Sequence, residues 1–303
     1  MTIPEKTIPI VEIPYSDKVQ VFIKREDVVH PEISGNKYWK LFYNINTYLE
    51  NEVENPLLIT FGGAFSNHIA ALAALGRDCG VPTMGIIRGE EVADLWKNNP
   101  TLVKAHADGM SFEFVSREDY RNKEALTQRF LKKYPEAVVI PEGGSNPLAI
   151  KGVQHMLDSR TKEFDYLCTA VGTGGTFAGL ASYAEKEQKV LGFKVVNDSE
   201  TDVRVALWTQ NSNREFIDAF GRGYGKITDE LIRFINDFST RFNVQLEPMY
   251  TAKMMMQLFK MIDENYFPEG SKILAFHTGG LQGIDGINKA LLKKNKEIII
   301  NIQ

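Results

Sequence analysis

The sequence predicts an α/β protein of two domains, each a three-layer α/β/α arrangement around a mostly parallel sheet. Short, continuous apolar stretches alternate with longer amphipathic ones, as expected of strands buried on both faces between covering helices. The length of 303 residues suits two domains. Four of the expected strand-to-helix junctions carry a glycine pair: Gly62-Gly63, Gly143-Gly144, Gly174-Gly175 and Gly279-Gly280.

The N-terminal stretch predicts an extended segment followed by a strand. Pro4, Pro9 and Pro14 are separated by β-branched residues, which indicates an extended chain over the surface. Residues 19–23 are largely apolar and alternate, which predicts a strand. The turn residues Ser34-Gly35-Asn36 then introduce an amphipathic helix that begins at about Lys37.

Residues 56–198 repeat the alternation of strands and helices. Residues 56–90 predict a strand, a glycine turn, a helix and a second strand, which is a βαβ unit. The same order recurs over residues 111–156 and again over residues 164–198. Because a βαβ unit joins parallel strands, this repetition predicts mostly parallel sheets.

The last third of the chain is expected to be mainly helical. Residues 198–242 are polar, and we expect helices there with a loop at residues 221–226. A helix from residue 251 and a final strand, glycine turn and helix over residues 272–292 complete the chain. Because the βαβ order restarts after Lys162, we predict a smaller α/β domain at residues 41–154. It would be inserted into a larger domain made of residues 1–40 and 155–303.

Composition excludes several classes of function. The net charge is −4, so no broad cationic field attracts nucleic acid. No apolar stretch approaches the roughly 18 residues of a membrane span, and residues 1–18 lack the pattern of a signal peptide, so we expect a cytoplasmic protein without membrane contact. Cys79 and Cys168 are isolated and no histidine pair has i,i+4 spacing, so we expect neither a disulfide nor a metal site.

Lys37 is the first candidate for chemistry. It follows a Gly-Asn turn and opens a helix whose neighbouring residues, Tyr38 and Trp39 among them, could desolvate its amine. Desolvation lowers the pKa of a lysine and frees the amine for Schiff-base formation. Most lysines are solvated surface charges, however, so by itself this position allows either role.

The turn at residues 171–179, VGTGGTFAG, is the strongest candidate for an anion site. Its glycines allow backbone N–H groups to converge at the start of a helix, and Thr173 and Thr176 add hydroxyl donors. The turn lacks the Gly-Lys-Ser/Thr ending of a nucleotide loop. Phe177 replaces the third glycine of a dinucleotide fingerprint, although Asp198 at the end of the next strand keeps an NAD-binding alternative open.

A second turn, GGAFSNH at residues 62–68, places three polar residues at the start of an Ala-rich helix. Ser66 or Asn67 could cap that helix. Together with His68 they could also form a pocket for a carboxylate. The pattern alone allows both interpretations.

Six stretches taken together resemble one family. They are KRED at 24–27, SGNKYWK at 34–40, GGAFSNH at 62–68, GTGGTFAG at 172–179, EPMYTAK at 247–253 and HTGG at 277–280. In this order they resemble the pyridoxal-phosphate enzymes that include 1-aminocyclopropane-1-carboxylate deaminase and D-cysteine desulfhydrase. The resemblance covers nearly the whole chain and implies their tryptophan synthase β-like fold, known as fold type II.

The resemblance implies roles for individual residues. Lys37, Ser66 and Tyr250 would be catalytic, with Lys37 forming the Schiff base and moving the α-proton. Pyridoxal 5'-phosphate would be bound by Lys37, Lys40 and Asn67, by Thr278 at the pyridine nitrogen, and by the turn residues Gly172, Thr173, Gly174, Gly175 and Thr176. The amino-acid substrate would contact Ser66, Asn67, His68, Tyr250 and Thr251. The resemblance also implies a homodimer.

Two departures bear on the reaction. Deaminases that open the cyclopropane ring resemble this chain but carry Glu and Leu where it has Thr251 and Thr278. A carboxylate beside the pyridine nitrogen makes the ring a strong electron sink, whereas a neutral hydroxyl suits α,β-elimination. We therefore expect D-cysteine, or a related β-substituted amino acid, to yield pyruvate, ammonia and hydrogen sulfide. Ring-opening deamination and a non-catalytic, cofactor-binding role remain alternatives, and His68, where many relatives carry Gln, leaves the substrate open.

Overall fold

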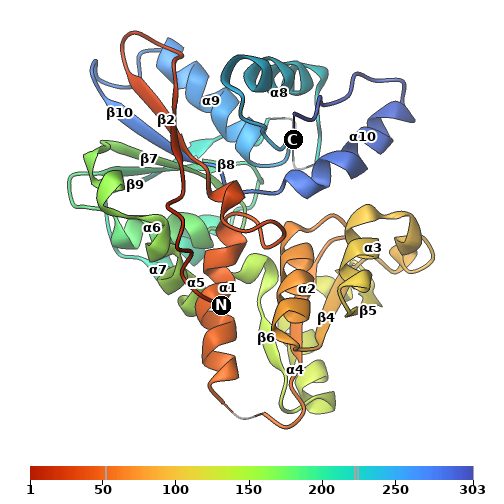
Figure 1. Cartoon of the computed structure of the whole chain (residues 1–303). Helices are drawn as coiled ribbons and strands as arrows, with labels where there is room; N and C mark the ends of the chain where they lie inside the picture. Colours follow the sequence, from red (N-terminus) through yellow and green to blue (C-terminus); the bar gives the residue numbers. More distant parts are fainter. Residues whose placement is uncertain (52, 222, 224, 303) are drawn as a thin grey trace.

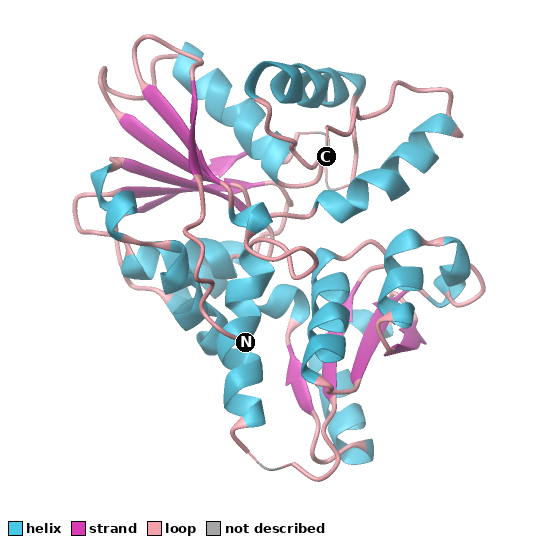
Figure 2. Cartoon of the chain, in the orientation of Figure 1, coloured by secondary structure: helices cyan, strands magenta, loops and turns pink. Residues whose placement is uncertain are grey.

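The computed structural model describes residues 1–51, 53–221, 223 and 225–302. Its strands form two separate sheets, a six-stranded and a four-stranded one (Figures 1 and 2). In the described part of the chain, every strand pairing except that of β1 with β2 is parallel. The predicted α/β class with mostly parallel sheets is therefore confirmed.

The six-stranded sheet has the order β1-β2-β10-β7-β8-β9. Its strands are β1 (Ile10–Ile13), β2 (Gln20–Lys24), β7 (Tyr166–Val171), β8 (Lys189–Lys194), β9 (Arg214–Asp218) and β10 (Lys272–Phe276). Strand β1 lies at the edge between Pro9 and Pro14. Proline cannot donate to a sheet, so prolines that flank an edge strand help to limit further pairing there.

The four-stranded sheet has the order β5-β4-β3-β6 and is parallel throughout its described strands. Its strands are β3 (Leu58–Gly62), β4 (Thr83–Arg88), β5 (Met110–Val115) and β6 (Val138–Ile140). Every side chain of β3 is buried, because helices cover both faces of this central strand.

Ten α-helices surround the sheets in the described residues. They are α1 (Asn36–Leu49), α2 (Asn67–Cys79), α3 (Pro100–Ala107), α4 (Lys123–Lys133), α5 (Pro147–Val153), α6 (Gly175–Tyr183), α7 (Thr201–Trp208), α8 (Asp229–Phe242), α9 (Thr251–Asp263) and α10 (Ile284–Leu292). One apolar core joins α8 and α9 to one face of the larger sheet, and a second packs α4 on the smaller sheet.

A third apolar core connects the two sheets. It contains Leu58 of β3, Leu167 of β7 and the buried side of α1, including Leu41 and Ile45. Helix α1 accordingly lies between the sheets (Figure 1). The predicted domain boundary after residue 40 falls inside this continuous helix, so the division into 1–40 with 155–303 and 41–154 stays a prediction.

Two strands were not predicted as strands: β1, expected only as an extended segment over the surface, and β9. Residues 198–242 were expected to be helical, but β9 lies between α7 and α8 and forms the far edge of the larger sheet. Its side chains are only partly buried and include Arg214, Glu215 and Asp218. An edge strand tolerates such charges, and this weakens the apolar signal of a strand. Arg222 and Tyr224 of the predicted loop lie outside the described residues.

None of the described helices is both long enough and apolar enough to cross a bilayer.

Candidate active site

The glycine turns of both sheets open into one large cavity. It has a volume of about 1450 Å³ and lies where β3, β6, β7 and β10 end. Carboxyl ends of parallel strands are the usual place for ligands in α/β folds. All four predicted glycine turns contribute to its wall, so chain segments from residue 36 to residue 280 meet there.

A close backbone approach fixes the start of α1 and with it Lys37. Gly35 has φ +63°, and a Cβ at this position would lie 1.9 Å from the carbonyl oxygen of Thr278. The next residue, Asn36, donates its backbone N–H to the same carbonyl at 3.4 Å. Only glycine fits at position 35, and the contact holds α1 against the turn after β10.

The amine of Lys37 lies at the cavity wall in an environment that disfavours its charge. Its Nζ donates to Asn36 Oδ1 at 2.9 Å. Burial lowers the pKa of Lys37 to about 8, although the nearby Glu247 carboxylate raises it in part. Near neutral pH the site therefore holds an appreciable fraction of neutral amine, the form that attacks an aldehyde.

Buried charges of the KRED stretch support α1 from behind. Trp39 of α1 donates its indole N–H to Glu26 Oε2 at 2.6 Å, and Lys24 Nζ lies 3.4 Å from Glu26 Oε1. Asp27 Oδ1 lies 3.5 Å from Nδ1 of His277, the residue before Thr278. These side chains lie outside the cavity lining, so the motif supports the site without contributing to its wall.

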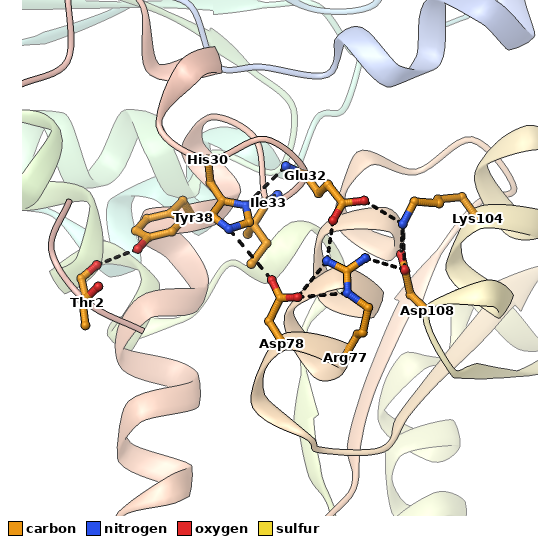
Figure 3. A network of polar contacts seen from close by, with 9 residues as sticks. All are labelled: Thr2, His30, Glu32, Ile33, Tyr38, Arg77, Asp78, Lys104 and Asp108. Atoms are coloured by element: carbon orange, nitrogen blue, oxygen red, sulfur yellow. Dashed lines mark hydrogen bonds and ion pairs between the residues drawn. The ribbon is translucent and has the colours of Figure 1, made fainter. Parts of the chain in front are cut away.

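The loop before α1 is tied to the smaller sheet's helices by an ion network (Figure 3). Glu32 accepts a hydrogen bond from Arg77 of α2, and Lys104 Nζ of α3 lies 2.7 Å from its carboxylate. These two bonds lower the pKa of Glu32 to about 2. Asp108 accepts from both cations at 2.6 Å. The loop that leads into Lys37 is thereby anchored to α2 and α3.

The turn after β7 gathers hydrogen-bonding groups as the sequence predicted. Gly174 has φ +90° and opens α6 at the cavity. Thr176 Oγ1 accepts from Asn36 Nδ2 at 2.7 Å, which connects this turn to the residue beside Lys37. The start of α6, where backbone N–H groups converge, favours the binding of an anion.

Lys40 completes this turn through a residue that the sequence analysis did not single out. Its buried Nζ donates to Ser145 Oγ at 2.7 Å, and Ser145 Oγ lies 2.6 Å from Thr173 Oγ1. A Cβ at Gly175 would lie 2.6 Å from Ser145 Oγ and 3.1 Å from Lys40 Nζ. Because Gly175 has no side chain, the space in which these polar groups converge stays open.

This donor set fits the phosphate of pyridoxal phosphate. Burial and the charge of Lys37 lower the pKa of Lys40 well below its ordinary value. A dianionic phosphate would favour the charged form of both lysines and accept from Thr173, Thr176 and the backbone of the turn. Lys37 and Lys40, the lysine of this anion cluster, also lie one turn apart on the same helix, α1.

Ser66 and Asn67 lie at the start of α2 and also line the cavity. Ser66 Oγ is the N-cap and accepts from the backbone N–H groups of His68 and Ile69, each at 3.3 Å. Asn67 Oδ1 accepts from Gln282 at 2.7 Å. Both side chains use oxygen as acceptor, so the Ser66 hydroxyl hydrogen and the Asn67 amide hydrogens remain as donors. Capping and carboxylate binding are thus compatible at this turn.

His68 is buried and differs from its neighbours. Its Nε2 lies 2.8 Å from Thr60 Oγ1, while the Thr60 hydroxyl donates to the carbonyl oxygen of Ile140 at 2.7 Å. The single hydroxyl hydrogen serves Ile140, so Nε2 must carry the proton and donate. Burial lowers the pKa of His68 well below its ordinary value, which keeps Nδ1 a bare acceptor without a partner among the described residues.

Tyr250 lines the cavity, and its ring packs against the phosphate turn. A Cβ at Gly172 would lie 3.0 Å from Tyr250 Cε1. The buried Glu247 holds the adjacent backbone, because its carboxylate accepts from the N–H groups of Met249, Tyr250 and Thr251 at 2.6–2.8 Å. Burial raises the pKa of Glu247 to about 7, against these hydrogen bonds.

Most predicted site residues meet at this cavity, with one exception. Its wall includes Lys37, Lys40, Ser66, Asn67, His68, Gly172, Thr173, Gly174, Gly175, Thr176, Tyr250 and Thr278. Thr251 is fully buried, hydrogen-bonded to Glu247 and absent from the lining, so its predicted contact with substrate lacks support from the structure.

The sequence analysis assigned no role to Ser145 or Glu247. The glycine pair Gly143-Gly144, which Ser145 follows, and the stretch EPMYTAK, which begins with Glu247, were both noted. A polar residue directly after a glycine pair is a signal that could have identified Ser145. In the described part of the chain, no group of three or more His, Cys, Asp or Glu side chains could hold a metal ion.

Comparisons with known proteins agree with this geometry. The profile of a family described as "Pyridoxal-phosphate dependent enzyme" matches residues 2–279. A mitochondrial bifunctional D-cysteine desulfhydrase/1-aminocyclopropane-1-carboxylate deaminase of Arabidopsis thaliana is 29% identical over 299 residues, 88% of this chain and 73% of that protein. A protein of Pyrococcus furiosus, provisionally named a 1-aminocyclopropane-1-carboxylate deaminase, is 29% identical over 313 residues, covering 93% of this chain and 91% of its own.

A solved structure extends the likeness to three dimensions. The crystal structure of an ACC deaminase homologue superposes with a TM-score of 0.81 at 26% identity, covering 96% of this chain and 94% of that one. The tryptophan synthase β-like fold and the pyridoxal-phosphate cofactor expected from the sequence are therefore confirmed. This chain belongs to the pyridoxal-phosphate-dependent enzymes.

Proposed function

We propose that this enzyme catalyses α,β-elimination on a small amino acid, of the D-cysteine desulfhydrase type. The observation that carries the proposal is the amine of Lys37, with its pKa lowered to about 8, in the same cavity as the Lys40–Ser145–Thr173 anion cluster. An amine of this kind suits both covalent attachment of an aldehyde and removal of a proton.

The residues at the cavity wall divide the work. Lys37 would hold the cofactor covalently, and Lys40, Ser145, Thr173 and the backbone of residues 172–176 would bind its phosphate. Bound there, the cofactor withdraws electrons from the substrate α-carbon and so acidifies the α-proton. The amine of Lys37 would then accept that proton.

The remaining roles concern orientation. Asn67 would face the ring hydroxyl of the cofactor, and the donors of Ser66 and Asn67 would bind the substrate carboxylate. Tyr250 would stand over the substrate as a proton carrier. Thr278 lines the same cavity, and its neutral hydroxyl toward the pyridine nitrogen favours elimination over ring opening.

The balance of the reaction is simple. The Cα–H bond breaks as its proton moves to Lys37, and the Cβ–S bond breaks with both electrons remaining on sulfur. The 2-aminoprop-2-enoate released reacts with one water to give pyruvate and ammonia, and hydrosulfide takes up a proton to give hydrogen sulfide.

A side-by-side assay tests the proposal. The cofactor-loaded protein is offered D-cysteine, L-cysteine and 1-aminocyclopropane-1-carboxylate, and the 2-oxo acids and sulfide are measured. We expect pyruvate with equal sulfide from cysteine, mainly the D-enantiomer, and Lys37→Ala is the inactive control. If more 2-oxobutanoate forms from the cyclopropane substrate than pyruvate from cysteine, the proposal is wrong and the enzyme is a deaminase.

A third outcome would indicate a non-catalytic protein. In that case the cofactor binds, no 2-oxo acid forms, and the substrate α-proton does not exchange in deuterated water. The homodimer implied by the resemblance and the cytoplasmic location expected from the sequence pattern stay predictions. Light scattering of the purified protein tests the first of them.

A further inference from the structure

Arg88 brings an additional positive charge to the cavity. It is the last residue of β4, and β4 pairs in parallel with β3 so that Ile87 lies beside Gly62. Arg88 is thus placed next to Gly63, and its Nη2 lies 3.7 Å from the position of a Cβ at that glycine. Both residues line the cavity. The guanidinium therefore stands at the entrance of the turn that continues to Ser66 and Asn67.

Neighbouring side chains orient this guanidinium without neutralising it. Its Cζ lies 5.7 Å from the centre of the Tyr120 ring, a distance suited to a cation–π contact. The Tyr120 hydroxyl donates to Glu142 at 2.9 Å, and Glu142 also forms an ion pair with Lys123 at 3.2 Å. Glu142, an acidic residue of the cavity lining, is thus engaged by other partners.

The other arginine of the cavity lining provides the contrast. Arg204 lies 2.5 Å from Asp198 and 3.5 Å from Glu200, so its charge is balanced within the protein. Arg88 forms no ion pair in the parts of the chain that the structure describes. The substrate carboxylate is expected to bind to the donors of Ser66 and Asn67, so the charge of Arg88 is not required for that role either. Arg88 is therefore a cation available to a ligand.

The size of the cavity leaves room for such a ligand group. Its volume of about 1450 Å³ exceeds the roughly 300–1,000 Å³ usual for small-molecule sites. Arg88 is exposed at the end of β4, so its guanidinium borders the cavity from the solvent side. A positive group held where negative charge develops stabilises the transition state. In α,β-elimination that charge develops on the β substituent as its bond to Cβ breaks.

We propose that Arg88 is the anion subsite for the β substituent of the substrate, so that preferred substrates are amino acids whose β substituent departs as an anion, a thiolate above all. This inference rests on the proposed elimination and deepens it. The Cβ–X bond breaks with its electron pair on X, and the resulting X⁻ is held by the guanidinium until it leaves. Opening a cyclopropane ring releases no separate anion, so Arg88 gives that reaction no comparable help.

Kinetics with graded leaving groups test the role. Arg88→Gln is compared with the parent enzyme on D-cysteine, whose hydrosulfide leaves poorly, and on β-chloro-D-alanine, whose chloride leaves readily. We expect kcat/KM to fall about 100-fold for D-cysteine and much less for the chloro compound. Arg117→Gln is the matched control, because Arg117 pairs with the exposed Glu91 outside the cavity lining. Equal losses on both substrates, or no loss, would overturn the proposal.

A binding experiment keeps the inference testable if turnover is absent. The ligand is 3-mercaptopropionate, which has a carboxylate and a thiol but no amine, and its affinity is measured by calorimetry above and below the pKa of its thiol. We expect the parent chain to bind the thiolate about tenfold more tightly than the thiol, and Arg88→Gln to lose this preference. A preference retained by Arg88→Gln would refute the subsite, while a lost preference without any elimination activity would refute only the proposed function.

Discussion

Two glycine turns of the cavity wall, residues 172–176 and residues 62–68, use their polar residues differently. At residues 172–176 the side chains of Thr173 and Thr176 bond to groups from other parts of the chain, Ser145 and Asn36, which converge on one small space. At residues 62–68 the polar side chains are engaged with their own helix or with the protein behind it.

The difference separates a general anion site from a selective one. The first turn collects hydroxyls, amide hydrogens and the amine of Lys40, which a bound anion would help to protonate, so it suits any oxygen-rich anion of the right size. In the second turn, the hydrogen bonds that each side chain makes within the protein determine whether a donor or an acceptor is left for the ligand. Ser66 and Asn67 are left as donors, whereas His68 is left as an acceptor. Changes at the first turn should therefore affect cofactor affinity, and changes at the second should affect substrate choice.

The largest effect is expected at Lys37, which lies between the two turns. Lys37→Ala removes the amine, so borohydride treatment should leave no cofactor attached to the peptide by mass spectrometry. Elimination should fall by at least about 10³-fold, since the same amine moves the α-proton. In the parent protein, the rate of covalent loading should rise as the pH passes through about 8, the lowered pKa of Lys37. A midpoint near the ordinary lysine value would contradict the buried site.

Glu247 lies close to the second of these turns. A Cβ at Gly280 would contact Asn67 and would lie 3.2 Å from Glu247 Cγ. Its pKa is raised from 4.5 to about 7, so the folded state binds a proton that the unfolded chain releases between these values. Its stabilising contribution is complete below pH 4.5 and is lost as the pH rises through about 7. The loss should amount to about 3 kcal/mol of unfolding free energy.

Urea unfolding at pH 5 and pH 8 measures this dependence. Glu247→Gln should flatten that part of the profile, and Glu264→Gln, at an exposed position after α9, should leave it unchanged. A profile of Glu247→Gln as steep as that of the parent would place the titration on another residue.

Ser145→Ala tests the general anion site. It removes the hydroxyl that joins Lys40 to Thr173 while keeping the backbone of the turn. Loss of one such hydrogen bond costs about 1 kcal/mol, so the dissociation constant of the cofactor should rise about fivefold with unchanged substrate preference. Visible absorbance titration measures it. Ser182→Ala, whose hydroxyl donates to Ala178 within α6, should bind the cofactor like the parent protein.

The smallest effect is expected at the selective turn, from Thr60→Val. The valine has the same shape but cannot accept from His68 Nε2, so the bond that fixes the tautomer is lost. Nitrogen-15 NMR of the imidazole should show a single Nε2–H form in the parent and a mixture in the variant. Cofactor affinity should not change, and relative rates on different substrates should shift by only a few-fold. An Nδ1–H form in the parent would refute the assignment.

Lys40 and Thr251 show which site residues can be placed from the sequence and which cannot. Lys40 is one helical turn from Lys37, so its side of the cavity follows from helix geometry. Thr251 follows Tyr250 directly, yet the first turn of α9 rotates it into the protein, where Glu247 binds its backbone. Adjacent positions at the start of a helix point in different directions, and no local pattern states which one faces the cavity.

The sequence by itself predicted most strands of the two sheets, the four glycine turns and Lys37 as a candidate at the start of a helix. These features are local, because backbone geometry and side-chain periodicity act over a few residues. The tertiary structure alone decided that Ser145 meets Lys40 across 105 residues, that Arg88 stands beside Gly63 and that β9 closes the larger sheet. Such pairings depend on how strands order themselves in a sheet, and strand order is set by packing of the whole chain.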